Sequence, residues 1–132
     1  MDDELPCPCD SGTPFGSCCG PVVRGERPAP TAERLMRSRY TAFVLGDEAH
    51  LLRTWHASTR PAEVRFGPGQ RWTGLEVLAT VGGALLDQEG AVEFRAHHER
   101  RGRSHSLHEL SRFVRDEAGA WVYLGAVEAE VD

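Results

Sequence analysis

Apolar residues recur at helical spacing between residues 32 and 45, where Met36 and Tyr40 lie about one turn apart and polar residues fill the positions between them. This period is typical of an amphipathic helix. Thr31 is a favoured N-cap residue, and Gly46 belongs to the residue type that most often ends a helix. The pattern predicts one helix over 32–45.

A second, shorter helix is expected directly afterwards. Asp47 can cap it, and Leu51, Leu52 and Trp55 then fall on one face. The stretch 61–69 holds two prolines and two glycines, which interrupt regular structure. We therefore expect a loop there.

After residue 71 the sequence becomes rich in Val, Leu, Phe, Trp and Tyr, the residues that favour strands. The expected strands are 72–80, 92–100, 104–115 and 121–127. Short turn signals separate the four segments, and connections of this length join antiparallel neighbours. Helices first and strands afterwards predict an α+β domain, with the helices on one face of a curved antiparallel sheet of about four strands.

The composition divides the chain in two. The 132 residues are 40% hydrophobic and 27% charged, which is ordinary for one small domain. Residues 1–30 are instead rich in Pro, Gly and Cys and contain almost nothing from which to build an apolar core. We predict a metal-binding segment and linker over 1–30 and a folded domain over 31–132.

The net charge, the apolar runs and the first residues of the chain disfavour several classes of protein. A net charge of −5 disfavours a direct nucleic-acid binder, and no run of 18 apolar residues is present to span a membrane. The acidic start of the chain does not resemble a secretory signal, so we expect a cytoplasmic protein.

All four cysteines lie within the first 19 residues, as Cys7-x-Cys9, eight residues, and then Cys18-Cys19. In a reducing compartment, clustered cysteines are metal ligands more often than disulfides. Four thiolates complete the tetrahedron of a structural Zn²⁺ and leave no open position for chemistry. Zinc binding of about 10–16 kcal/mol would suffice to order a segment that lacks a core. The alternative is a set of free thiols or a redox pair.

Several segments resemble known proteins. Residues 7–20 resemble the SEC-C zinc motif, and four further segments resemble the YchJ-like family: 35–43, 54–61, 72–75 and 107–115. The resemblance implies a SEC-C motif joined to an NTF2-like cone, a bent antiparallel sheet around helices. It also implies a protein partner for the SEC-C segment, since such motifs elsewhere contact secretion chaperones or ribosomes, and a homodimer through the sheet. Asp10 stands where the family usually has Gly, which adds negative charge, and residues 13–17 lack the usual basic residues.

NTF2-like cones often enclose a cavity, so polar residues on the inner face of the sheet are candidate ligand contacts. Strand alternation places Glu109 on one face with Leu107, Ser111 and Phe113, opposite Arg112. Glu109 could form a general acid–base pair with His56, or a salt bridge with Arg112 or Arg39. Further candidates for the pocket, or for a structural role, are Tyr40, Trp55 and Arg112.

The predicted function is binding, as a module for a protein partner or for a small ligand in the cone. The alternative is a hydrolase- or isomerase-like enzyme that uses Glu109 and His56. Fold resemblance cannot decide between them, because one fold hosts many functions.

Overall fold

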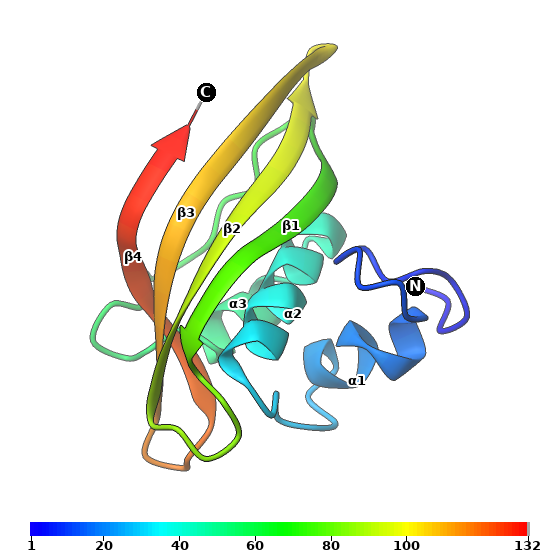
Figure 1. Cartoon of the computed structure of the whole chain (residues 1–132). Coiled ribbons are helices and arrows are strands. Elements are labelled where there is room, and N and C mark those ends of the chain that lie inside the picture. The colour runs from blue at the N-terminus through cyan, green and yellow to red at the C-terminus, as the bar shows by residue number, and fades with distance from the viewer. Residues whose placement is uncertain (132) are drawn as a thin grey trace.

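The computed structural model describes residues 1–131 and is an α+β fold in which helices pack against one curved sheet (Figure 1). The elements in chain order are the 3₁₀ turn η1 (Phe15–Ser17), helices α1 (Cys19–Val23), α2 (Ala32–Leu45) and α3 (Glu48–Arg53), and strands β1 (Gln70–Gly82), β2 (Glu89–Arg100), β3 (Arg103–Arg115) and β4 (Trp121–Val131). The predicted fold class, with helices first and a meander of strands afterwards, is confirmed.

Helix α2 forms where the apolar periodicity predicts it. The Thr31 side chain accepts a hydrogen bond from the Arg34 N–H (3.1 Å), and Gly46 ends the helix in the left-handed conformation with φ of 69°. Both caps satisfy backbone groups that the helix itself leaves unpaired. The expected helix 32–45 is therefore confirmed at both ends.

Helix α3 ends at Arg53, two residues before Trp55, which the sequence placed on its apolar face. The chain leaves the helix because Thr54 and His56 pair with β4 instead: Tyr123 N–H donates to Thr54 O, and His56 N–H donates to Tyr123 O, both at 2.8 Å. Trp55 therefore stands on an extended segment against the sheet and not on the helix.

The four strands pair in sequence order, and each pair is antiparallel. Register shifts interrupt the β1–β2 pair after Trp72 and after Val77, and two more interrupt the β3–β4 pair. Bulges of this kind bend and twist a strand. The four register shifts therefore account for part of the curvature with which the sheet wraps around α2.

Helix α2 lies between the sheet and the N-terminal segment (Figure 1). One buried cluster joins both sides: Phe15 and Val23 from the N-terminal segment belong to it together with Leu35 of α2 and Phe94 of β2. The first 30 residues thus contribute apolar side chains to the common core, which their Pro- and Gly-rich composition did not lead us to expect.

No helix among residues 1–131 combines the length and the apolar character that crossing a bilayer requires.

Candidate metal centre and ligand cavity

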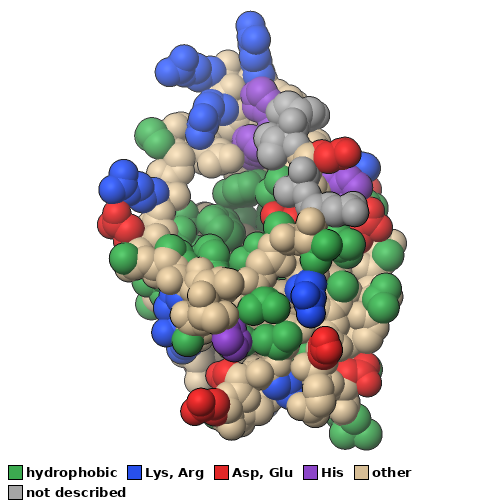
Figure 2. Space-filling model, turned by 90° about the vertical axis from the view of Figure 1, so that its left-hand side faces the viewer, with side chains coloured by type: hydrophobic (Ala, Val, Ile, Leu, Met, Phe, Trp, Pro, Cys, Tyr) green, Lys and Arg blue, Asp and Glu red, His purple; other side chains and the backbone are tan. Residues whose placement is uncertain are grey.

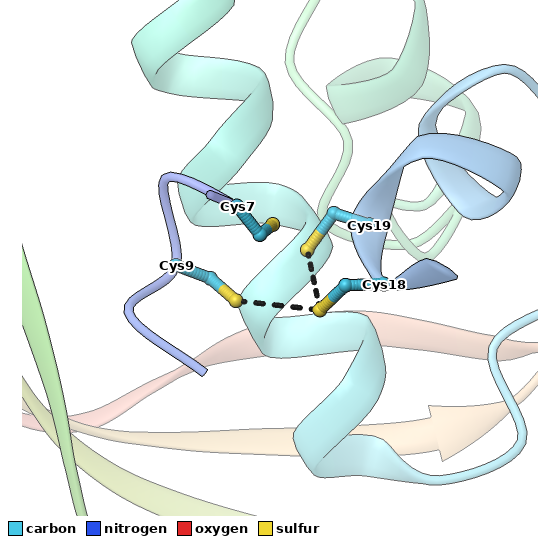
Figure 3. Close-up of side chains that lie close together, drawn as sticks. All are labelled: Cys7, Cys9, Cys18 and Cys19. Carbon is cyan, nitrogen blue, oxygen red and sulfur yellow. Dashed lines mark hydrogen bonds between the residues drawn. The ribbon is translucent and has the colours of Figure 1, made fainter. Parts of the chain in front are cut away.

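Four cysteine side chains converge on one point beside α2 (Figure 3). Cys7 and Cys9 come from the N-terminal loop, while Cys18 and Cys19 come from the start of α1. All four Sγ atoms lie within 4.8 Å of one another, with 3.6 Å between Cys9 and Cys18 and 4.0 Å between Cys18 and Cys19. Thiolates about 2.3 Å from a central zinc ion form a tetrahedron with edges of about 3.8 Å. The spacing fits a four-coordinate metal ion.

The loop closes because its backbone turns sharply at defined residues. Cys7 N–H donates to Thr13 O (3.0 Å), and Gly12 adopts φ of 84°, a conformation that favours glycine. At Gly20 a Cβ atom would come within 2.8 Å of Phe15 O. Glycine is therefore needed at both positions to bring the two pairs of cysteines together.

The protonation states of Cys7, Cys9 and Cys19 depend on one another. The pKa of Cys9 is lowered, because Cys19 and Cys7 hydrogen-bond to its thiolate. The pKa of Cys19 is raised, because hydrogen bonds with Cys7 and Cys9 favour its protonated form and burial adds to the effect. One thiolate thus opposes the next, and a cation bound among them would favour their deprotonated forms.

Two side chains fasten the cysteine loop to the rest of the fold. Asp10 adopts a left-handed backbone with φ of 61°, and its carboxylate accepts the N–H of Leu75 in β1 at 3.0 Å. Arg37 of α2 donates from Nη1 to the carbonyl of Cys9 at 2.9 Å. Asp10, which the resemblance places where a glycine is usual, is thus a contact to the sheet as well as a negative charge.

A cavity of about 270 Å³ lies on the other side of α2, between that helix and the inner face of the sheet. Figure 2 shows a hollow in the molecular surface with hydrophobic side chains on its walls. The lining is mainly apolar and aromatic: Met36, Arg39, Tyr40, Phe43, Trp55, Trp72, Phe94, Ala96, Leu107, Glu109, Ser111, Phe113 and Tyr123.

Glu109 supplies a carboxylate to this cavity. Its Oε2 accepts hydrogen bonds from the hydroxyl of Ser111 and, at 3.3 Å, from that of Tyr123. Burial, together with the charge of Glu109, raises the pKa of Tyr123 to about 12, so this hydroxyl stays protonated as a donor. These bonds hold the carboxylate against the floor of the cavity.

Arg39 supplies a cation that is only 7% exposed. Its Nη1 donates to Leu51 O and to Thr54 Oγ1, both at 2.8 Å, and its guanidinium lies over the rings of Trp55 (4.8 Å) and Tyr123 (4.6 Å). Burial lowers the pKa of Arg39 to about 10, so the side chain remains charged at neutral pH.

The structure separates the residues that the sequence grouped. Tyr40, Trp55 and Glu109 line the cavity. His56 does not line it, and its Nδ1 lies 2.6 Å from Ser58 Oγ, so the Glu109–His56 pair of the alternative enzyme hypothesis is not assembled. Arg112 lies on the opposite face of β3, where Nη2 is 3.7 Å from Glu89.

The sequence indicates Arg39 only as a salt-bridge partner of Glu109. The two side chains interact through their charges across the cavity, but no ion pair between them is formed in the described residues. The sequence did carry a signal for Arg39 as a cavity residue, since it occupies the apolar stripe of α2 between Met36 and Tyr40.

The fold and the cysteine cluster together define a class: an NTF2-like α+β cone that carries an N-terminal SEC-C-type cysteine segment. Residues 31–126 match the family described as "YchJ, middle NTF2-like domain". The chain belongs to this YchJ-like family, whose relatives include proteins designated UPF0225.

Comparisons with individual proteins agree with this family assignment. A UPF0225 protein of Streptomyces coelicolor is 54% identical over 89% of this chain and 91% of its own length, and one of Deinococcus radiodurans is 45% identical over 93% and 89%. The solution structure of a SEC-C motif-containing protein from Rhodopseudomonas palustris has a TM-score of 0.79 at 31% identity, covering 96% of this chain and 98% of that one. A crystal structure of a SEC-C motif-containing protein from Psychrobacter arcticus has a TM-score of 0.75 at 28% identity, covering 92% and 81%.

Proposed function

We propose that this protein binds a small, largely aromatic molecule in the cone, and that the four cysteines hold a structural Zn²⁺ that fixes the N-terminal segment against α2. The observation that carries the binding function is the cavity of about 270 Å³, in which apolar walls surround a few polar groups held in fixed positions. Concave apolar sites with a few convergent polar groups are the usual form of small-molecule sites.

The donor set supports zinc in a structural role. Cys7, Cys9, Cys18 and Cys19 would fill all four positions of a tetrahedral ion, so none remains for water or substrate. The bound ion would neutralise part of the negative charge of the buried thiolates. Its bonds to sulfur would also join the N-terminal loop to the start of α1. The hydrogen bond from Leu75 N–H of β1 to the Asp10 carboxylate would then transmit this order to the sheet.

Metal analysis tests the zinc site. Protein purified without chelator should contain about one zinc per chain, and Cys18→Ser should lose most of it, since three thiolates leave the site open. Ser17→Ala, at the exposed neighbouring position, is the matched control and should retain the metal. Clearly less than one equivalent in wild-type protein with reduced thiols would overturn the zinc site.

The volume sets the size of ligand that the cone can take. A dry apolar cavity of about 150 Å³ binds one benzene ring, so about 270 Å³ has room for a fused pair of rings. At about 0.3 kcal/mol for each non-hydrogen atom, a probe of about thirteen such atoms gains roughly 4 kcal/mol, which corresponds to a Kd of about 1 mM.

Calorimetry with the neutral probe 2-naphthamide tests the binding function. Wild-type protein should bind it saturably, and Ala96→Phe should abolish binding, because the new ring projects from the cavity wall. Ala79→Phe adds the same ring at an exposed position of β1 and should leave the affinity unchanged, provided that both variants keep the circular dichroism of the wild type. Equal affinity for the two variants, or no saturable binding by the wild type, would refute the proposal.

A further inference from the structure

Arg39 presents an unused hydrogen-bonding edge to the cavity. Both of its hydrogen bonds within the described residues leave from Nη1, to Leu51 O and Thr54 Oγ1, so Nε and Nη2 have no protein acceptor there. Arg39 is nevertheless only 7% exposed, and it lines the cavity. Neither nitrogen is among the fully buried polar atoms without a partner in residues 1–131, so both are open to the cavity, where a ligand can supply the acceptor.

The geometry of the free edge selects the acceptor. Nε and Nη2 form a rigid planar fork that matches the two oxygens of a carboxylate. The rings of Trp55 and Tyr123 and the two bonds from Nη1 hold this fork in place before any ligand arrives. A fork that is already ordered loses little entropy on binding.

The walls select the rest of the ligand. Seven aromatic side chains line the cavity, from α2, the segment after α3 and the sheet: Tyr40, Phe43, Trp55, Trp72, Phe94, Phe113 and Tyr123. Aromatic rings pack favourably against one another in offset or edge-to-face arrangements, beyond the value of the area they bury. A planar ring therefore suits these walls better than a flexible aliphatic chain does.

The charges inside the cavity permit an anion. Arg39 and Glu109 balance each other, and Oε2 of Glu109 is already occupied by the hydroxyls of Ser111 and Tyr123. Arg100 lies against Gly67, which lines a smaller pocket that shares Phe43 and Trp72 with the main cavity. Figure 2 shows further basic side chains on the same face as the hollow. Acidic side chains lie on the same face (Figure 2), so the attraction of an anionic ligand is local to the basic side chains beside the entrance.

We infer that the ligand is an aromatic carboxylic acid whose carboxylate pairs with Nε and Nη2 of Arg39 while its ring lies among the aromatic walls. The inference rests on the proposed binding function and specifies the chemistry of the ligand for the same cavity.

Three naphthalene probes of nearly equal shape test it by calorimetry at constant ionic strength: 2-naphthoate, neutral 2-naphthamide and cationic 2-(aminomethyl)naphthalene. Wild-type protein should bind the carboxylate at least tenfold more tightly than the amide, and the amine most weakly. Equal binding of carboxylate and amide would overturn the inference while the binding function stands, as would preference for the amine. Absence of binding by all three would refute the binding function itself.

Octanoate separates aromatic acids from aliphatic ones. It carries the same carboxylate on a flexible chain and should bind clearly more weakly than 2-naphthoate. Equal affinity would overturn the aromatic part of the inference.

Arg39→Lys assigns the preference to the guanidinium. The variant keeps the positive charge but lacks the planar fork, so the ratio of carboxylate to amide affinity should fall at least fivefold while the amide itself binds as before. Arg34→Lys, at an exposed position of the same helix, should keep the wild-type ratio. A wild-type ratio in folded Arg39→Lys would overturn the role of Arg39. If that variant does not fold, the ratio measured on wild-type protein decides.

Discussion

A buried histidine makes the fold sensitive to acid. His50 of α3 is 1% exposed, with Nε2 2.9 Å from Ser38 Oγ and Nδ1 2.9 Å from Arg53 Nη2. Because the guanidinium can only donate, Nδ1 must accept and Nε2 must carry the proton. Nε2–H then donates to Ser38, whose hydroxyl donates onward to Leu35 O at 2.7 Å. This network requires a neutral imidazole, so lowering the pH is the perturbation that breaks it.

The size of the effect follows from the pKa of His50. Burial, reinforced by the charges of Arg53 and Arg39 and partly offset by Asp47, lowers this pKa from 6.5 to about 4. Since the unfolded chain takes up the proton first, the contribution to stability is complete above pH 6.5 and is lost as the pH falls through 6.5 toward 4. A shift of this size is worth about 3 kcal/mol in full, of which about 2 kcal/mol is lost by pH 5.

Urea unfolding between pH 7.5 and pH 5, at a fixed excess of zinc, measures this loss. His50→Gln cannot titrate but keeps the other groups, including the cysteines, so the difference between wild type and variant isolates the histidine. The wild type should lose about 2 kcal/mol more than the variant over this range. Parallel loss of stability in the two proteins, or an NMR titration that places the pKa of His50 near 6.5, would refute the reasoning.

The remaining predictions concern the contacts around α2. Asp10→Ala should cost about 2 kcal/mol in urea unfolding, because the Leu75 N–H loses a charged acceptor. Asp10→Gly should cost about 1 kcal/mol less, because glycine relieves the left-handed backbone; equal costs would contradict this. Thr31→Ala should cost about 1 kcal/mol by removing the cap of Arg34 N–H, and no loss would contradict the cap. Chelation should weaken 2-naphthamide binding by at least threefold, and an unchanged affinity in metal-free protein would refute the coupling of the two sites.

The part of the fold that was predictable from the sequence is the part specified by local periodicity. Helix α2 and the four strands follow the spacing of apolar residues. Helix α1 was not predicted, because its five residues are too few for a period and because it packs against α2 beside the cysteine cluster. Such short helices depend on tertiary contacts rather than on helix propensity.

The candidate site divides in the same way. The spacing of the cysteines predicted their cluster, and strand alternation predicted that Leu107, Glu109, Ser111 and Phe113 share one face of β3. All four line the cavity, so that face is the inner one. The position of His56 was not predictable from strand alternation, because the sequence does not show that residues 54–56 are extended. Consecutive residues of an extended segment point to opposite sides, so Trp55 reaches the cavity and His56 does not.

Helix α2 connects the two sites, because different faces of it serve each. Arg37 and Thr41, four residues apart, contact the cysteine loop: Arg37 donates to Cys9 O, and Thr41 Oγ1 lies 3.8 Å from Cys7 Sγ. Met36, Arg39, Tyr40 and Phe43 line the cavity. Helix α2 is a single continuous helix. Contacts of its outer face with the cysteine loop therefore limit how far its inner face can move. The positions of the Arg39 fork and of the aromatic wall therefore depend on the cysteine cluster, although no cysteine reaches the cavity.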